Sequence, residues 1–176
     1  MGYRNRCSSA PRSSAFILLS LLLFGLACHA NAADDSRTAL RGVREMAINV
    51  NVVSDKRGCD ISVESVQTNA QYLLASRLRL VPTSPEVLVI TVMTVAILDA
   101  GETVPLGCAA LVKVASNLRA DAKILATRQD APNVMFQATD FGWVGATSRE
   151  NLQEAVDRAA SDGVKRFIVD WSQVNR

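Results

Sequence analysis

One continuous apolar run constrains the fold more than any other feature of the sequence. It extends from Val87 to Leu98 (VLVITVMTVAIL) and is rich in β-branched side chains. Such side chains have restricted χ1 angles and pack well on a pleated surface. Both alternate sets of residues are apolar, as in a strand that is buried on both faces. The run predicts the central strand of a sheet, and the rest of the chain is expected to cover it.

The first 32 residues have the three parts of an export signal. A leader with three arginines and no acidic residue precedes an apolar block at 15–27, and Ala30-Asn31-Ala32 supplies the small residues that signal peptidase recognises. The block is shorter than the roughly 20 residues of a membrane-spanning helix. We therefore expect residues 1–32 to be a signal peptide, cleaved between Ala32 and Ala33, and the product to be periplasmic or secreted with no membrane span.

A second interpretation of the same segment is a lipoprotein signal. Gly25-Leu-Ala-Cys28 is similar to a bacterial lipobox, in which Cys28 becomes the lipidated first residue. A good lipobox has Leu three positions before the cysteine, whereas this chain has Gly25. Anchoring through Cys28 is the alternative to soluble release.

Removing the signal changes both charge and chemistry. The chain has 19 basic and 17 acidic residues, so 16 and 17 remain beyond residue 32, with a net charge of −1. No long basic run is left, and the sequence therefore lacks the electrostatic footprint of a nucleic-acid-binding protein. The only histidine, His29, is also removed. Histidine-dependent nucleophilic triads and histidine-ligated metal sites are thereby excluded from the remaining chain, and we expect no enzyme activity, cofactor or metal.

Two cysteines remain, Cys59 and Cys108. Exported chains meet an oxidising compartment in which a pair of thiols tends to form a disulfide. Such a bridge would close a long loop and stabilise the fold by about 3–4 kcal/mol on the chain-entropy model. The alternative is that both are buried separately as small apolar residues.

Periodicity predicts the first part of the domain. Residues 46–53 alternate apolar and polar side chains, which indicates a half-buried strand. Ser62 is expected to cap a helix whose apolar stripe runs from Val63 to Leu78. Residues 106–127 alternate over a long stretch and predict one long, bent strand, with a helix over the second half as the alternative.

The last third contains the clearest helix. Asp130-Ala-Pro-Asn133 predicts a turn before a strand at 134–146, and Thr147-Ser-Arg-Glu150 has the spacing of a capping box. Gly163 within the closing helix is expected where the helix crosses another backbone closely. The apolar stripe of this helix comprises Leu152, Val156, Ala159, Gly163, Phe167, Trp171 and Val174.

These elements predict the order β-α-β-β-β-α and a two-layer α+β or α/β domain. Two helices are expected to pack on a mixed, mostly antiparallel sheet. Residues 33–45 form a short lead-in, and residues 46–176 form a single domain. No predicted element covers the second apolar face of 87–98. The bend of the long strand, a dimer mate or another protein could cover it.

Acidic residues offer little catalytic chemistry. Asp140-Phe-Gly142 matches the magnesium motif of kinases, but the chain has neither a glycine-rich nucleotide loop nor a catalytic loop. Asp140 would be buried if it shared the face of Val134, Phe136 and Ala138, and otherwise lies at a strand end bonded to the backbone. Two further pairs of acids are expected at turns: Asp99 with Glu102, and Asp55 with Asp60.

Phe141 and Trp143 are candidate interaction residues, because aromatic side chains supply much of the energy at interfaces. The two side chains share one face of the predicted strand. The favoured alternative is that both rings cover the sheet beneath the closing helix, near Phe167 and Trp171, since a small core needs its few aromatics.

Three stretches resemble a family of small, uncharacterised exported proteins of Gram-negative bacteria. They are Leu40-Arg-Gly-Val43, the strand Thr139…Trp143-Val-Gly145, and Phe167-Ile-Val-Asp-Trp171…Val174-Asn175. The topology is similar to that of the TolB N-terminal domain and of the periplasmic penicillin-binding-protein activators. This resemblance implies protein–protein interaction in the periplasm, and it supplies no catalytic residues.

Together these features predict a non-enzymatic periplasmic interaction module, an accessory or adapter protein of a cell-envelope assembly. Its partner would be an envelope protein or a second copy of the chain, and nucleic acid is not expected. The alternative is a periplasmic small-molecule-binding protein with a pocket between the sheet and the closing helix.

Overall fold

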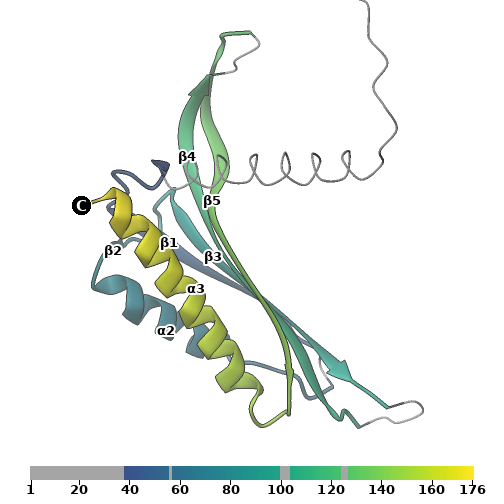
Figure 1. The fold of residues 1–176 in the computed structure, drawn as a ribbon. Helices are drawn as coiled ribbons and strands as arrows, with labels where there is room; N and C mark the ends of the chain where they lie inside the picture. The colour runs from purple at the N-terminus through teal and green to yellow at the C-terminus, as the bar shows by residue number, and fades with distance from the viewer. Residues whose placement is uncertain (1–37, 56, 100–103, 124–126) are drawn as a thin grey trace, which may run out of the picture. The chain divides into compact units, whose positions relative to one another are not determined.

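The computed structural model describes residues 38–55, 57–99, 104–123 and 127–176. Residues Ser36–Arg176 form one compact unit, and its elements are shown in Figure 1. The expected signal segment 1–32, with the cleavage site Ala32–Ala33 and the alternative anchor Cys28, lies outside the described residues. Cleavage and lipidation therefore stay predictions.

The described chain forms a mixed five-stranded sheet and two helices, as the sequence predicts. The sheet order is β2-β1-β3-β4-β5. β1 runs parallel to both of its neighbours, and β3, β4 and β5 are antiparallel. The two-residue strand β2 is absent from the sequence prediction. The elements are β1 (Glu45–Val53), α2 (Val63–Ala75), β2 (Arg79–Leu80), β3 (Val87–Ile97), β4 (Gly107–Lys123), β5 (Asp130–Thr147) and α3 (Leu152–Val174).

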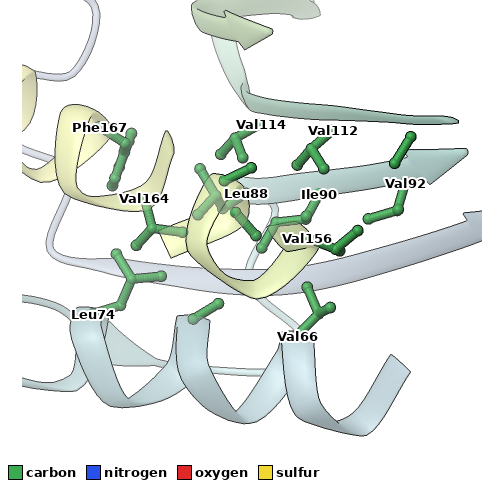
Figure 2. Close-up of a cluster of buried hydrophobic side chains, with 14 of the residues drawn as sticks. Val66, Leu74, Leu88, Ile90, Val92, Val112, Val114, Val156, Val164 and Phe167 are labelled. Carbon is green, nitrogen blue, oxygen red and sulfur yellow. The ribbon is translucent and has the colours of Figure 1, made fainter. Parts of the chain in front are cut away.

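Both helices pack on the same face of the sheet, and the core lies between the two layers (Figure 1). Leu88, Ile90 and Val92 of β3 alternate with less buried neighbours and point toward the helices. Figure 2 shows these side chains with Val112 and Val114 of β4, opposite the apolar stripes of α2 and α3. The run that predicts the central strand is thus β3, and helices cover only one of its faces.

Local signals in the sequence explain how α2 begins. The Ser62 hydroxyl accepts a hydrogen bond from the backbone N–H of Ser65 at 3.2 Å, which confirms the predicted N-cap. The buried stripe of α2 consists of Val66, Ala70 and Leu74. The helix ends at Ala75, and the buried Leu78 belongs to the turn that follows it rather than to the helix.

Gly163 allows α3 to lie close to the sheet. A Cβ at this position would lie 2.5 Å from Cγ2 of Val114 and 2.7 Å from Cδ1 of Phe141. Non-bonded carbon atoms do not approach this closely, so a side chain at this position would have to displace its neighbours, whereas glycine fits. The predicted close crossing is present. The neighbouring atoms, however, belong to side chains of β4 and β5 and not to a second backbone.

The predicted capping box at Thr147–Glu150 is wrong. Thr147 is the last residue of β5 and pairs with Cys108, and α3 begins at Leu152 after Asn151. The Glu150 carboxylate bonds its own backbone N–H and the Ser148 side chain, which hold its pKa below the usual value. Strand pairing therefore overrides the local helix-start signal.

The predicted turn at 130–133 is also wrong, because β5 already begins at Asp130. Arg128 has a φ of 57° and lies in the turn that precedes the strand. Pro132 is tolerated inside β5 because this strand is at the edge of the sheet, where a missing N–H disrupts no second ladder. The long strand expected at 106–127 is present as β4 up to Lys123, and the helical alternative is wrong.

The lead-in before β1 is held by the C-terminal end of α3. The Asn175 side chain accepts from the Gly42 N–H at 2.7 Å and donates to the Leu40 carbonyl at 2.8 Å. Leu40 is fully buried, and Gly42 has a φ of +84° that favours glycine. The described part of the lead-in is therefore an integral part of the domain.

Candidate interaction surface

A row of exposed apolar side chains crosses the sheet on the face away from the helices. Val53, Met93, Leu111 and Val144 are direct partners in the register of β1, β3, β4 and β5. Directly paired residues project from the same side of a sheet. Their exposed fractions are 59%, 45%, 38% and 74%. No described helix or loop covers this row.

The row continues toward the end of β3. Val95 and Ile97 lie on the same face at every second position, with exposed fractions of 54% and 38%. We call this set the open-face patch. It comprises Val53, Met93, Val95, Ile97, Leu111 and Val144. Contiguous exposed apolar surface on one face marks an interaction site more often than scattered apolar residues do.

Polar residues border the open-face patch on its other side. The adjacent row consists of Asn51, Thr91, Lys113 and Gly142. The Lys113 ammonium lies 3.3 Å from the Asp140 carboxylate, which belongs to the next row. An apolar centre beside a polar border has the anatomy of a protein interface.

The alternation of β3 explains why the face stays open. The sequence run 87–98 is apolar at every position, but α2 and α3 pack on only one face of the sheet. The even-numbered residues from Leu88 to Ala96 are buried, Leu88, Ile90 and Val92 beneath the helices and Thr94 and Ala96 beside the loop that follows β1. The odd-numbered residues Met93, Val95 and Ile97 are exposed. The sequence leaves open what covers this second face, and among the described residues nothing covers it at the far end of β3.

Phe141 and Trp143 lie on the helix side of the sheet. Both are partly buried and pack against the core cluster. Phe141 contacts the α3 crossing at Gly163, and the Trp143 ring lies over Gly145 of its own strand. This arrangement matches the alternative in which both rings cover the sheet. The large apolar side chain that is exposed here is Val144, which lies between Trp143 and Gly145 and which the aromatic signal does not identify.

Asp140 is not a buried carboxylate. Its side chain is 53% exposed and pairs with Lys113. The register shifts at this point, because Ser116 pairs with Thr139 while Asn117 pairs with Gln137. This bulge leaves Ala138 as an extra residue and reverses the alternation that would place Asp140 inside. Asp140 is therefore a surface residue of the open face.

Asp55 has a structural role at the end of β1. Its carboxylate accepts from Arg57 Nη2 at 2.8 Å and from the Ala96 backbone N–H at 3.1 Å. The Arg57 side chain first, and then the backbone N–H groups, hold the pKa of Asp55 far below its usual value. The same pairing raises the pKa of Arg57. Asp55 thus fastens the loop after β1 to β3.

Of the remaining acidic candidates, the structure describes Asp60 and Asp99. Asp60 is exposed in the loop before α2, and Asp99 is exposed at the end of β3. Glu102 lies outside the described residues. Within the described ranges, no group of three or more acidic, cysteine or histidine side chains could hold a metal ion.

Cys59 and Cys108 form a disulfide, with Cα atoms 5.8 Å apart. The bridge joins the loop after β1 to the start of β4. Both cysteines are fully buried. Beside them, the Thr94 hydroxyl donates to the Cys59 carbonyl at 2.6 Å. This loop is held at the end of the sheet that carries the open-face patch by three contacts: the disulfide, the Thr94 hydrogen bond and the bonds of Asp55.

The space between the sheet and α3 is too small for a metabolite. The cavity there has a volume of about 30 Å³ and is lined by Val114, Phe141 and Gly163 among others. Ligand pockets typically have volumes of roughly 300–1,000 Å³. Larger open cavities lie elsewhere, with about 350 Å³ between β1 and α2 and about 570 Å³ beside the lead-in. The latter is lined by Arg41, Arg44 and Arg119 together with Glu45 and Glu86.

No helix in the described part of the chain has the length and hydrophobicity needed to cross a membrane. Comparison with known proteins places the chain in no family, because no family model and no curated protein matches it. A solved structure of a homolog of the neuraminyllactose-binding hemagglutinin from Helicobacter pylori has 8% sequence identity and a TM-score of 0.27. The alignment covers 73% of this chain and 81% of that chain. A likeness at this level supports no inference about fold or function, and the resemblance to exported envelope proteins stays a prediction.

Proposed function

We propose that the protein is a non-catalytic interaction module of the bacterial cell envelope, acting as an accessory or adapter. Its open-face patch binds a partner protein that presents an apolar surface of its own. The observation that carries this proposal is the exposed row Val53–Met93–Leu111–Val144, which crosses four paired strands. Because this surface lies on paired strands that are already ordered, little conformational entropy is lost when the partner binds.

The non-catalytic part of the proposal is supported by composition and by the titrating groups. Residues 33–176 contain no histidine. The described groups with clearly shifted pKa values are Asp55, Arg57 and Glu150, and each is engaged in fixing a loop. Catalytic sites instead gather shifted groups in a cleft.

The envelope location is supported by the N-terminal pattern and by the disulfide. The first 32 residues have the features of an export signal. The Cys59–Cys108 bridge is of the kind that persists in oxidising compartments. Both observations agree with a periplasmic or secreted protein.

Chemical crosslinking in intact cells tests the proposal. The chain carries a purification tag after Arg176, and crosslinked partners are identified by mass spectrometry. Val144→Lys places a charge in the open-face patch. Tyr72→Lys is the matched control, because Tyr72 is 82% exposed on α2, in the helix layer.

We expect one envelope protein to be recovered with the wild type and with Tyr72→Lys but lost with Val144→Lys. Equal recovery with both variants would contradict the use of this face. Self-crosslinks alone would indicate that a second copy covers the patch. If no protein is recovered above background, the adapter function is contradicted, and small-molecule binding becomes the favoured alternative.

A further inference from the structure

The sheet has an unpaired edge on β1, independent of the open-face patch. β2 pairs with Glu45 and Met46 only, whereas β1 continues to Val53. The Val81 N–H donates to the Met46 carbonyl at 3.0 Å on the β2 side, and the Ala47 N–H donates to the Glu86 carbonyl at 2.8 Å on the β3 side. The even-numbered residues of β1 therefore direct their backbone groups outward.

Val50 and Val52 follow the same alternation. Their N–H and C=O groups point to the side of β1 that β2 no longer occupies. Among the described residues, no backbone hydrogen bond joins these groups to another segment. Unpaired backbone groups on an edge are a template for another strand. The stretch from Ile48 to Val53 contains neither proline nor a charged residue that would discourage such pairing.

A cavity lies beside the start of this free edge. It has a volume of about 350 Å³ and is open to solvent. Ile48 and the chain from Leu80 to Pro82 supply apolar surface, and Gln67 and Gln71 of α2 line it as well. These two glutamines are four residues apart and so are neighbours on one helix face. Neither side-chain amide has a hydrogen-bond partner among the described residues.

These features specify the chemistry of an occupant. Outward backbone groups two residues apart recur about every 6.6 Å along a strand, a spacing that an extended polypeptide reproduces. The lining of the cavity has apolar side chains and neutral amides but no charged group. An apolar side chain of the occupant would enter the cavity, while the glutamine amides bond its backbone. Peptides are recognised in this way by domains that add a strand to a sheet edge.

We propose that the edge of β1 and the α2 cavity bind an extended, uncharged polypeptide segment as an additional strand. This site is distinct from the open-face patch, since one lies along the edge of the sheet and the other on its uncovered face. The opposite edge, β5, is less suited because Pro132 and the irregular pairing near Ala120–Ala122 interrupt it.

A phage-displayed library of random 12-residue peptides, selected on the purified chain, supplies the probe. The enriched peptide is synthesised, and its Kd is measured by isothermal titration. Gln71→Trp fills the cavity from the helix side. Thr68→Trp is the matched control, because Thr68 is exposed on α2 and does not line the cavity.

We expect the Kd to rise at least tenfold for Gln71→Trp and to change less than twofold for Thr68→Trp. Bound peptide should slow amide hydrogen exchange at Val50 and Val52, a readout that needs no variant. Val144→Lys should leave peptide binding unchanged, so this proposal and the proposed function fail separately. Failure to enrich any peptide, equal affinity for Gln71→Trp, or unchanged exchange at Val50 and Val52 would overturn the proposal.

Discussion

The indole Nε1 of Trp171 donates a hydrogen bond to the carbonyl oxygen of Val43 at 2.8 Å. This contact joins the last turns of α3 to the segment before β1. Asn175 extends it through its bonds to Gly42 and Leu40. Two of the three stretches that carry the resemblance to exported proteins therefore meet in space. We call these contacts of Trp171 and Asn175 with the segment 40–43 the C-terminal clamp. The clamp explains the residue types of both stretches without a catalytic role.

Removing the clamp should destabilise the domain. Asn175→Ala deletes hydrogen bonds to Leu40 and Gly42 and leaves both backbone groups without these partners. We expect a loss of about 1–2 kcal/mol in the free energy of unfolding, measured by urea denaturation. Gln173→Ala, at an exposed neighbouring position, should change it by less than about 0.5 kcal/mol. Equal effects of the two substitutions would show that the clamp contributes nothing.

Gly163 should not tolerate even a methyl group. Gly163→Ala gains roughly 1 kcal/mol of helix propensity but forces a carbon against Val114 and Phe141. Such overpacking typically costs about 1–3 kcal/mol, so we expect a lower melting temperature despite the better helix former. The decrease in melting temperature caused by Gly163→Ala should be smaller in a Val114→Ala background than in the wild-type background, because the smaller side chain leaves room for the added methyl group. A stabilised Gly163→Ala variant would contradict the close packing of α3 on β4 and β5.

Reducing the disulfide should weaken the fold measurably. Cys59 and Cys108 are 49 positions apart. A loop of this length corresponds to about 4 kcal/mol on the chain-entropy model. We expect the denaturant midpoint to fall after reduction or in the Cys59→Ser/Cys108→Ser double variant. Two titratable thiols in residues 33–176, counted in the unreduced, denatured protein without the first 32 residues, would instead show that the bridge does not form.

The contribution of Asp55 should depend on pH. Because its pKa in the folded protein is far below the usual 3.8, the ionised form stabilises the fold above that value. This stability is lost as the pH falls from about 4 toward the folded pKa. Asp55→Asn should therefore have a lower melting temperature than the wild type at pH 7, and the difference should narrow below pH 4. The exposed Asp60→Asn is the control, and a difference for Asp55→Asn that is constant over this range would refute the role of the charge.

Much of the fold follows from side-chain periodicity. β-branched runs and the stripe of α3 predict these elements correctly because the pattern of burial is regular along them. The wrong predictions lie where a tertiary contact overrides a local signal. Thr147 resembles a helix cap but pairs with Cys108, and Pro132 resembles a turn residue but is accommodated at an edge.

The candidate surface could be predicted only in part. The apolar second face of 87–98 is visible in the sequence, and the structure leaves its far end uncovered. Val144 could not be identified, because its exposure depends on the bulge near Ala138 and on the register with Leu111. The contact between Trp171 and Val43 could not be predicted either, because no local sequence pattern links two residues so far apart in the chain.

Site-specific photocrosslinking at position 144 tests whether the open-face patch is the interaction surface. Benzoylphenylalanine replaces Val144 in one strain and Tyr72 in a second, and both are irradiated in intact cells. We expect an adduct with another envelope protein from position 144 and none from position 72. No adduct at position 144, or the same adduct at both positions, would contradict the assignment of the open-face patch as the interaction surface.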